Sequence, residues 1–431
     1  MKNAHAIVGS FWLAGALAFN GIPGTGTLRS LFLVLGLIHL VALVRRRPAR
    51  PSWPDHRSAL KLLLVFVLWL LVQSVIFAVA PYESLKEIVS HWGKILVVIF
   101  MMVAFVAYSE DAKNTRNWLM LGTFLSGFFH VVTTLGLQTW KVMTTGQFSI
   151  GESLFGNYGY ISPYITMSLS LLTAEIIARL SFKKSLLPFR FSFIWLFFFL
   201  TLCAEGLLAA KAGYLMSVVQ LAVAFGILVF VYKDGHKFVI GLTFIVFLVS
   251  LAVPLMFANR WANIGESIAA SIKAKDDVVD TVFRPASPLP DIDPSIYLRY
   301  SYAKAGLDAI ADRPMGYGYG SIGYGRFIEE KAGLSGAVSS HSGWIDFTID
   351  NGIPGFILLI LLIGALLKRS FTNFVWYGNP ASLALLLVVV NYIGRCAIDG
   401  HLVGSRLTGF AIATAALWAA SSVIDYEDKP S

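Results

Sequence analysis

The strongest constraint in the sequence is a series of apolar runs that reach the length of a membrane-crossing helix. Crossing a hydrocarbon core of roughly 30 Å takes about 20 apolar residues in a helix. Twelve segments meet this length or come close to it: 6–22, 28–44, 58–80, 90–108, 117–136, 160–180, 191–209, 213–232, 238–257, 344–367, 379–398 and 407–424. We therefore predict an all-α polytopic membrane protein with about twelve transmembrane helices, which form a single transmembrane domain over residues 1–431.

The amino-acid composition supports this class and excludes three others. Hydrophobic residues make up 56% of the chain and charged residues 14%, and the mean hydropathy is +0.69. A soluble globular protein has about a quarter charged residues, so that class is excluded. The shortage of charge also excludes an extended disordered chain, and two cysteines are too few for a secreted disulfide scaffold. Cys203 and Cys396 both fall inside predicted spans, where we expect them to pack without pairing or binding metal.

The positive charge of the chain is a topology signal. Lys and Arg total 34 against 25 Asp and Glu, for a net charge of +9. With the N-terminus in the cytoplasm, the cytoplasmic tails and loops hold sixteen Lys and Arg, and the short external loops hold six. This asymmetry follows the positive-inside rule and predicts that both termini are cytoplasmic. Removing the first span as a signal peptide would invert every later loop, so we keep it. No nucleic-acid partner is implied.

One long polar connection interrupts the spans. Residues 258–343 form an insertion of 86 residues between the ninth and tenth spans, with nine basic and ten acidic side chains. The orientation places it outside the cytoplasm. Its first half is acidic and rich in proline, whereas its second half has a helical pattern over 296–310 followed by a glycine-rich turn region. A loop of this length in a compact protein is usually functional or disordered.

His341 lies at the end of this loop, just before an interrupted span. The apolar run from Ile353 to Leu367 is only 15 residues long, so the span must begin near Trp344 and contain the Asn-Gly-Ile-Pro-Gly sequence 351–355. Pro and Gly inside a membrane helix free backbone groups that protein or a wet cavity must satisfy. The positive end of the helix would bind an anion and keep a nearby imidazole neutral, and so basic. An ordinary interfacial histidine is the alternative.

A small set of cationic side chains is predicted on the same side as His341. Arg299 precedes the glycine-rich region and has the fork that binds phosphate in a bidentate manner; alternatively it pairs with an acid of the loop. Lys211 lies in a short external turn, where it would meet an anion or extend to water. The candidates for binding a shared anionic ligand are Arg299, Lys211, Lys86, Arg395 and Arg406.

Other chemical motifs are weak or missing from the sequence. There is no Gly-x-x-x-x-Gly-Lys phosphate loop and no His-Glu-x-x-His zinc pair, which argues against an ATP-driven pump and a metalloprotease. Asp291 and Asp293 have the spacing of a metal-binding Asp-x-Asp, but we interpret them as solvated charges in a proline-rich loop. Glu175 and Arg179 are spaced to pair along a helix. We predict neither a metal site nor a cofactor.

Three motifs together resemble the bacterial O-antigen ligase family. They are His341 through Gly355, Arg299 through Gly318 with its Asp-Arg-Pro-x-Gly-x-Gly sequence, and Ala210 through Leu215. The third departs from the family, which usually has Ser-Arg-Gly where this chain has Ala210-Lys211-Ala212. Lys keeps the charge but loses the bidentate fork. In topology the resemblance covers nearly the whole chain.

The resemblance implies a GT-C-like membrane glycosyltransferase of lipopolysaccharide biosynthesis in the bacterial inner membrane. Such an enzyme moves O-antigen polysaccharide from undecaprenyl pyrophosphate to a sugar hydroxyl of lipid A–core at the periplasmic face. Pyrophosphate is already a good leaving group, so cationic stabilisation suffices without nucleotide or metal. In this family, His341 would be the general base, and Arg299 and Lys211 would bind pyrophosphate with support from Lys86, Arg395 and Arg406.

Three other functions fit parts of this pattern. An O-antigen polymerase uses the same donor with a second carrier-linked glycan as acceptor. A protein O-oligosaccharyltransferase often has a domain after its last span, whereas we expect only residues 425–431 to follow it here. A transporter of lipid-linked glycans would place charged or broken helices at the midplane in both halves. Because the polar groups here gather at one membrane face and in one loop, we expect an enzyme at the membrane surface and not a transporter. Among such enzymes we expect a ligase.

Overall fold

The computed structural model describes residues 2–46, 57–147, 152–208, 211–231, 294–320, 323–333, 339–400, 402 and 404–423, together with residues 241, 266 and 269. Its helices are α1 (Lys2–Asn20), α2 (Gly26–Arg46), α3 (Arg57–Ile76), α4 (Pro81–Ile88), η1 (Val89–Gly93), α5 (Lys94–Ala107), α6 (Ala112–Thr145), α7 (Tyr158–Phe182), α8 (Phe191–Leu208), α9 (Lys211–Val231), α13 (Pro294–Asp312), α14 (Gly323–Ala332), α15 (Gly343–Tyr377), α16 (Pro380–Cys396) and α17 (Gly404–Ser421). Two short antiparallel strands, β1 (Glu152–Ser153) and β2 (Gly156–Asn157), are the one departure from an all-α fold in this part of the chain.

The predicted multi-pass helical membrane fold is confirmed. Within the described ranges, eight helices are long and apolar enough to cross a membrane, and two further apolar helices, His5–Asn20 and Pro380–Cys396, are shorter. Helices occupy eleven of the twelve predicted spans. The remaining segment, 238–257, lies almost wholly outside the described residues, as do residues 258–293 of the long loop, so the count of twelve and the extent of the loop stay predictions.

The fourth span begins earlier than the predicted 90–108. The helices α4, η1 and α5 form one continuous run over Pro81–Ala107, which places Lys86 inside the run and not before it. Pro81 at the start of α4 explains the difference, because its fixed φ suits the first turn of a helix and its missing N–H is not needed there.

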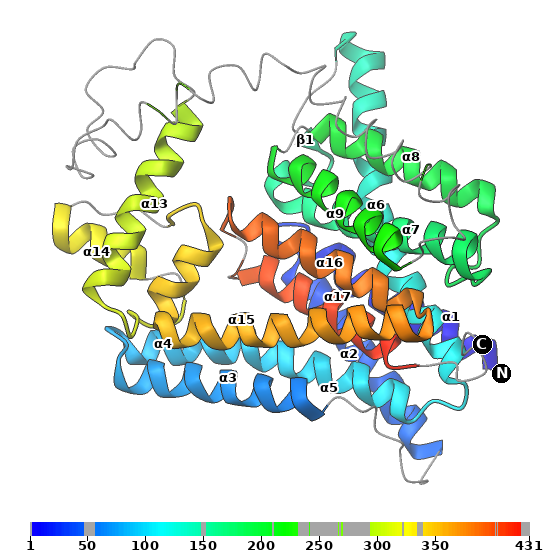
Figure 1. The fold of residues 1–431 in the computed structure, drawn as a ribbon, viewed down its shortest axis with the longest axis horizontal. Coiled ribbons are helices and arrows are strands. Elements are labelled where there is room, and N and C mark those ends of the chain that lie inside the picture. Colours follow the sequence, from blue (N-terminus) through cyan, green and yellow to red (C-terminus); the bar gives the residue numbers. More distant parts are fainter. Residues whose placement is uncertain are drawn as a thin grey trace.

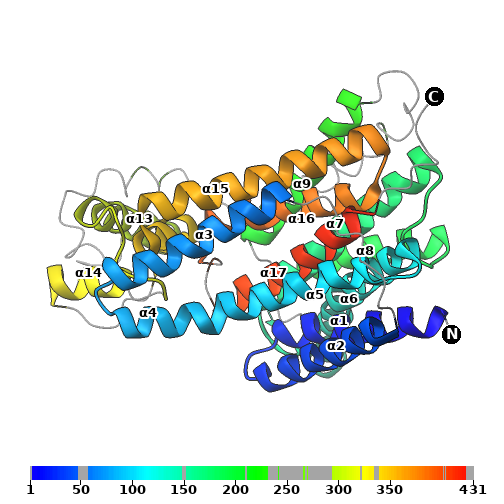
Figure 2. The same ribbon diagram turned by 90° about the horizontal axis from the view of Figure 1, so that it is seen from below.

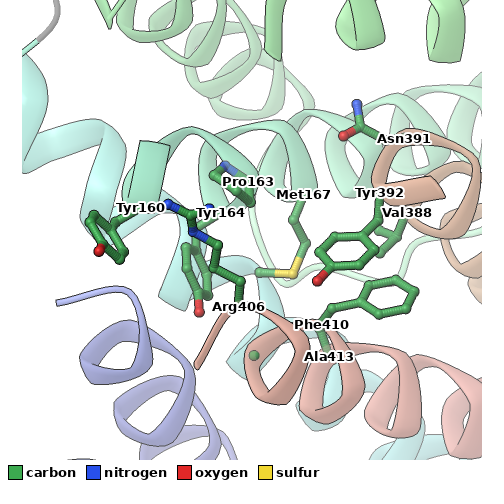
Figure 3. Close-up of a pocket in the computed structure, with 11 residues that line it drawn as sticks. Tyr160, Pro163, Tyr164, Met167, Val388, Asn391, Tyr392, Arg406, Phe410 and Ala413 are labelled. Atoms are coloured by element: carbon green, nitrogen blue, oxygen red, sulfur yellow. The ribbon is translucent and has the colours of Figure 1, made fainter. Parts of the chain in front are cut away.

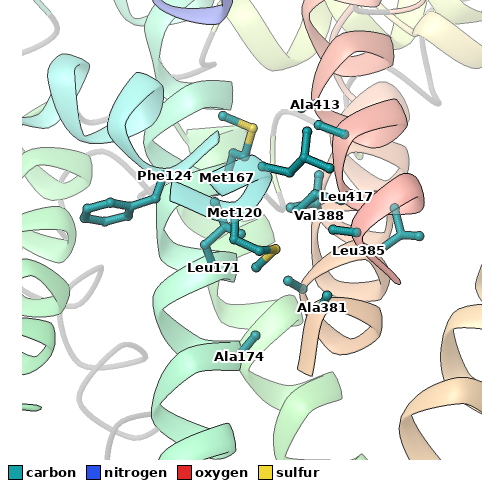
Figure 4. Close-up of a cluster of buried hydrophobic side chains, with 14 of the residues drawn as sticks. Met120, Phe124, Met167, Leu171, Ala174, Ala381, Leu385, Val388, Ala413 and Leu417 are labelled. Atoms are coloured by element: carbon teal, nitrogen blue, oxygen red, sulfur yellow. The ribbon is translucent and has the colours of Figure 1, made fainter. Parts of the chain in front are cut away.

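The largest apolar core lies where α6, α7, α16 and α17 meet (Figure 4). Met120 of α6 lies beside Met167 and Leu171 of α7, and Leu385 of α16 belongs to the same cluster, whereas the Phe124 ring of α6 points away from them. These side chains are 6% exposed or less, so the contacts between these helices are closely packed. Glu175 and Arg179 of α7 form the predicted pair, with 2.6 Å between Oε1 and Nε, and both cysteines are free.

A second layer is built around α15, which runs beside α3 (Figure 1). α13 packs against the first part of α15, and α13 and α14 lie at the end of the molecule opposite the start of α1 (Figure 2). The predicted helix over 296–310 is therefore confirmed as α13, followed by the predicted glycine-rich turn.

The predicted break in α15 is present at Gly352. Its φ of 73° and ψ of 170° are not helical, and Pro354 follows within the same helix. The Asp350 carbonyl would normally accept a hydrogen bond from the N–H of residue 354, but proline has none. In a membrane each unsatisfied backbone group costs several kcal/mol, so these groups need other partners.

The glycine-rich segment after α13 supplies the backbone partners. Three hydrogen bonds join it to the break: Tyr317 N–H to Ile349 O at 2.9 Å, Gly318 N–H to Asp350 O at 2.9 Å, and Ile353 N–H to Pro314 O at 2.8 Å. The segment thus runs beside the broken helix like a short strand. This close approach explains the glycine at position 316. Gly316 has a φ of +90°, and its Cα lies against the backbone of residues 350–352.

Two side chains of α3 complete the hydrogen bonding of the break. The Gln73 Nε2 donates to the Asp350 carbonyl at 2.9 Å. The Trp69 Nε1 donates to the Asn351 carbonyl, also at 2.9 Å. Gln73 is fully buried, which is rare for an amide side chain facing a membrane helix unless its hydrogen bonds are satisfied. The break therefore joins α3, α15 and the glycine-rich segment after α13 in one structure.

Replacing Gly316 with alanine should strongly destabilise the protein. A Cβ there would lie 2.6 Å from both the Asp350 carbonyl oxygen and the Gly352 nitrogen, and the positive φ disfavours any L side chain. We expect a loss of at least about 1–3 kcal/mol, measured as a lower melting temperature in detergent. Gly364→Ala, in the same helix but with nothing within 4 Å of its Cβ, is the matched control and should leave the melting temperature unchanged or slightly higher. Equal melting temperatures for the two variants would contradict this role of the break.

Candidate active site

The loop that carries His341 is held by a buried carboxylate. Asp346, in the first turn of α15, is 8% exposed. Its Oδ1 accepts the Ser340 N–H at 2.7 Å and its Oδ2 accepts the Ser339 hydroxyl at 2.8 Å. A carboxylate is favoured at this end of a helix by the helix dipole. Residues 339–342 are thereby fixed just before α15 begins.

The backbone of His341 is itself strained. Its φ of +59° lies in the left-handed region, which a side chain with a Cβ rarely adopts and which costs about 1–3 kcal/mol. The His341 N–H donates to the Ser339 hydroxyl oxygen at 2.9 Å. The next backbone donor, Ser342 N–H, donates to the Ser340 hydroxyl oxygen at 3.2 Å. The one after it, Gly343 N–H, donates to the Asp399 carbonyl at 3.2 Å, which ties the loop to the connection between α16 and α17. Backbone strain of this kind persists only where surrounding contacts hold it. Here these contacts give the His341 side chain a defined direction.

The imidazole of His341 is exposed and available. Its ring lies 5.4 Å from that of Tyr302, and within the described residues neither ring nitrogen has a hydrogen bond. Partial burial and the nearby Arg299 guanidinium lower the pKa of His341 below its ordinary value, while Asp399 and Asp346 oppose this in part. The ring is therefore neutral at pH 7 and can accept a proton. The lowered pKa agrees with the neutral imidazole expected from the sequence. Its main cause is desolvation of the ring and not the positive end of the helix.

The position of Arg299 follows from how α13 packs on α15. Gly306 of α13 lies so close to Ile345 and Ser340 that a Cβ on it would meet Ile345 at 2.4 Å. Arg299 lies about two helical turns before Gly306, half-buried, and its charge acts on His341. The structure therefore brings together Arg299 and His341, which are 42 residues apart in the sequence.

Arg406 is connected to the same site through Asp399. Its Nη1 donates to the Gly400 carbonyl at 3.1 Å and lies 4.0 Å from the Asp399 Oδ1. Asp399 also holds the His341 loop through its own backbone carbonyl. One acidic residue in the α16–α17 connection thus contacts both the loop of the candidate base and a candidate cation.

An apolar groove opens beside this site. It has an empty volume of about 790 Å³ and an apolar surface throughout. Trp344, three residues after His341, is part of its wall, and its indole N–H donates to the Ile393 carbonyl at 3.1 Å. Its lining comes from α3, η1, α5, α15, α16 and α17: Leu63, Trp92, Ile95, Ile99, Trp344, Leu359, Leu362, Ile363, Leu366, Val389, Tyr392, Ile393, Cys396, Leu402, Leu407, Phe410, Ala411, Thr414, Ala415 and Trp418. Such a groove suits a hydrocarbon chain.

Arg395 lies inside the helix bundle, away from this exposed surface. It is fully buried, and its Nη1 donates to the Ser162 hydroxyl at 2.8 Å, which in turn donates to Glu205 Oε1 at 2.6 Å. Gly213 leaves room for all three, since a Cβ there would collide with each of them. A buried guanidinium needs such compensation, so the cluster accounts for the charge of Arg395. Its contact with an external anion stays a prediction.

The two remaining predicted cations are placed separately. Lys86 is exposed on α4, and no contact within the described residues joins it to His341. Lys211 begins α9, two residues before Gly213 of the buried cluster, but its side chain lies outside what the structure describes. Asp291 and Asp293 lie outside the described residues as well.

Sequence reasoning gave no role to Asp346, Asp399 or Tyr302. Asp346 carried a usable signal, because a carboxylate in the first turn of a membrane helix, four residues after a serine N-cap, has a reason to be there. The contacts of Asp399 and Tyr302 with the His341 loop and ring carried none, since they depend on how distant helices pack. In the described part of the chain, no group of three or more His, Cys, Asp and Glu side chains has the arrangement of a metal site.

Comparison with protein families identifies the region that contains this site. A family model described as O-antigen ligase matches residues 196–360, from α8 to the middle of α15. The chain thus carries an O-antigen ligase family domain, which confirms the resemblance, and the match includes Lys211, Arg299 and His341. The family comprises O-antigen ligases and related polymerases. No curated protein matches the chain.

The electrostatics of His341 predict opposite effects of two substitutions. Diethyl pyrocarbonate modifies neutral imidazole, so its rate at the His341 peptide against pH, read by mass spectrometry, reports the pKa of this residue. Arg299→Gln should raise that pKa and Asp399→Asn should lower it, because the first removes a repelling charge and the second an attracting one. Lys304→Gln, also on α13, is the control and should leave the pKa unchanged. Shifts of the same sign in Arg299→Gln and Asp399→Asn would contradict this account.

Proposed function

We propose that this O-antigen ligase family protein transfers O-antigen polysaccharide from undecaprenyl pyrophosphate to a sugar hydroxyl of lipid A–core. One observation carries the proposal: an exposed, neutral imidazole lies beside a guanidinium, next to an apolar groove. A lipid-linked pyrophosphate substrate needs these three features together. The transfer takes place at the periplasmic face of the bacterial inner membrane, with both termini in the cytoplasm, in agreement with the distribution of Lys and Arg.

In the proposed reaction, His341 acts as the general base. Its neutral ring takes the proton from the acceptor hydroxyl as that oxygen attacks the anomeric carbon of the donor sugar. The bond from this carbon to the pyrophosphate oxygen breaks, and the electron pair leaves with undecaprenyl pyrophosphate. A positioned base of this kind contributes about 10²–10⁴-fold to the rate.

Cations stabilise the charge that develops on the leaving group. Arg299 is the first candidate, because it lies beside His341 and its planar fork matches a phosphate. Lys211 is the second, as the position where this chain departs from the usual arginine of the family. Lys86 is exposed at the same end and adds long-range attraction. Arg395 and Arg406 contribute from behind Asp399, which the charges of both residues reach.

The apolar groove provides a place for the polyprenyl chain of the donor. Its wall is apolar throughout and comes from several helices, so the groove can cover part of a long isoprenoid. Trp344 joins the groove to the His341 loop, so a chain in the groove presents its pyrophosphate next to Arg299. Every further isoprene unit extends along the helices into lipid.

Replacing His341 should remove transfer without unfolding the protein. His341→Ala should lower the rate of the reconstituted reaction about 10²–10⁴-fold, with a melting temperature no lower than that of the native chain, because alanine loses no hydrogen bond of the ring. His5→Ala, near the start of α1, serves as the control and should keep full activity. An active His341→Ala variant would remove this residue from the mechanism.

The reconstituted reaction itself decides between ligase and polymerase. Purified protein is mixed with undecaprenyl-pyrophosphate-linked glycan and O-antigen-free lipopolysaccharide, with EDTA and without nucleotide, and the products are separated on a gel. A ladder on lipid A–core supports the ligase. Longer carrier-linked chains with bare lipid A–core would make the protein a polymerase, and no product with either acceptor would favour a transporter.

The groove assignment predicts a selective effect on the donor. Ala411→Phe puts a ring into the groove from α17 and should raise KM for the lipid-linked donor, with kcat changed much less. Leu68 of α3 is 60% exposed. Leu68→Phe is therefore the matched control and should leave KM and kcat unchanged. An unchanged donor KM in Ala411→Phe would place the polyprenyl chain elsewhere.

A further inference from the structure

A second cavity lies between α7, α16 and α17, beside the apolar groove (Figure 3). It has an empty volume of about 440 Å³. Its inner wall is buried and mostly apolar, with Met167 at 6% exposure and Ala413 at 1%. The buried amide of Asn391, which donates to Gln220 Oε1 at 3.1 Å, also lines it. At its outer end lies Arg406, whose side chain is 24% exposed. The cavity therefore runs from a charged opening into the hydrocarbon-like core, which is the shape that a lipid with a charged head requires.

A pair of stacked rings separates this cavity from the groove. Tyr392 and Phe410 are parallel within 2°, with their centroids 3.8 Å apart, and both line both spaces. Ala411 and Ala413, two residues apart on α17, line the groove and the cavity respectively. One helix thus has separate contacts with two neighbouring apolar spaces.

Arg406 lies at the opening of this cavity with its guanidinium over the ring of Tyr160, 4.8 Å from the ring centre. Figure 3 shows it directed toward Tyr160 and Tyr164, with Phe410 and Val388 farther along the cavity. Its nearest carboxylate in the described residues, Asp399, is 4.0 Å away, at the limit of an ion pair. The guanidinium keeps part of its binding capacity for a ligand.

A second guanidinium reaches the same wall through two hydrogen bonds. Arg29 Nη1 donates to Asn20 Oδ1 at 2.7 Å, and Asn20 Nδ2 donates to the Tyr164 hydroxyl oxygen at 2.5 Å. The charges of Arg29 and Arg406 both act on Tyr164, which lines the cavity. Arg29 is half-buried, its Nε has no hydrogen-bond partner, and no carboxylate of the described residues pairs with it. A half-buried cation without a counter-charge is costly unless an anion binds beside it.

We propose that this cavity is a second lipid site, which holds one hydrocarbon chain of an anionic lipid and binds its phosphate between Arg406 and Arg29. The fork of each guanidinium matches the phosphate oxygens. The cavity is narrow and lies among side chains of α7, α16 and α17, so the proposed site takes one chain and not a whole lipid. A membrane phospholipid and a phosphorylated glycolipid acceptor share this chemistry. Binding of the lipid does not depend on the proposed ligase function.

The test measures lipid binding to the purified full-length chain by native mass spectrometry. The probes are phosphatidylglycerol and phosphatidylcholine with identical acyl chains. We expect phosphatidylglycerol to remain bound at detergent concentrations that remove phosphatidylcholine, and the double variant Arg29→Gln/Arg406→Gln to lose at least tenfold in its affinity. The single variant Arg406→Lys keeps Arg29 and a positive charge at position 406, so it should lose less affinity for phosphatidylglycerol than the double variant.

Two alanines of α17 provide the matched control for the position of the chain. Ala413→Phe fills the cavity and should abolish retention of phosphatidylglycerol, whereas Ala411→Phe fills the groove and should leave it unchanged. Equal binding of the two lipids, equal retention by both alanine variants, or an unchanged affinity in the arginine double variant would overturn the proposal. If Ala413→Phe does not fold, the arginine variants still test the proposal.

Two further measurements distinguish the source of the lipid. If the site belongs to the acceptor, lipid A–core displaces phosphatidylglycerol, and Ala413→Phe raises KM for the acceptor while KM for the donor stays the same. If it belongs to a membrane phospholipid, phosphatidylglycerol stays bound in the presence of lipid A–core. Both results support an anionic-lipid site. A chain that binds phosphatidylglycerol but transfers no glycan would refute the proposed function and leave this inference standing.

Discussion

The structure depends on how the chain satisfies the backbone groups freed at the Gly352 break of α15. A membrane-spanning helix interrupted by glycine and proline exposes carbonyls that lipid cannot hydrogen-bond. The side chains of Trp69 and Gln73 supply two donors, and the backbone of the segment 314–320 supplies the others. Since these partners come from two stretches of sequence outside α15, the break forces α3, α15 and the segment 314–320 together.

This arrangement has a direct consequence for the candidate site. The segment 314–320 anchors the end of α13 to the middle of α15, so α13 must run back along the first turns of that helix. Gly306 permits the close approach, and Arg299 is thereby brought to His341. Meanwhile Asp346 holds the loop in front of α15 in a strained backbone conformation. The break and the imidazole thus belong to one structural unit, although the break itself makes no contact with His341.

The charged residues of the chain divide into two environments. Arg299 and Arg406 lie at the surface, near a base or a cavity, with part of each side chain accessible. Arg395 is enclosed by Ser162 and Glu205, where the low dielectric makes its hydrogen bonds necessary for burial. The sequence pattern does not distinguish these cases, because Arg395 lies only a few residues before an external turn. Burial depends on which helices surround it, and the neighbouring helices are distant in sequence.

By itself, the sequence determined the class of the fold, the positions of most helices, the break in α15, the helix over 296–310 and the choice of His341 as a candidate residue. These features follow from local properties: the length of apolar runs, the missing N–H of proline and the few polar groups in a largely apolar chain. Only the tertiary structure decided what closes the break, which cations lie near His341, that Asp346 and Asp399 hold its loop, and that two apolar spaces lie on either side of Tyr392 and Phe410. Each of these depends on contacts between helices far apart in the sequence, and such contacts are set by packing in three dimensions, which no local pattern records.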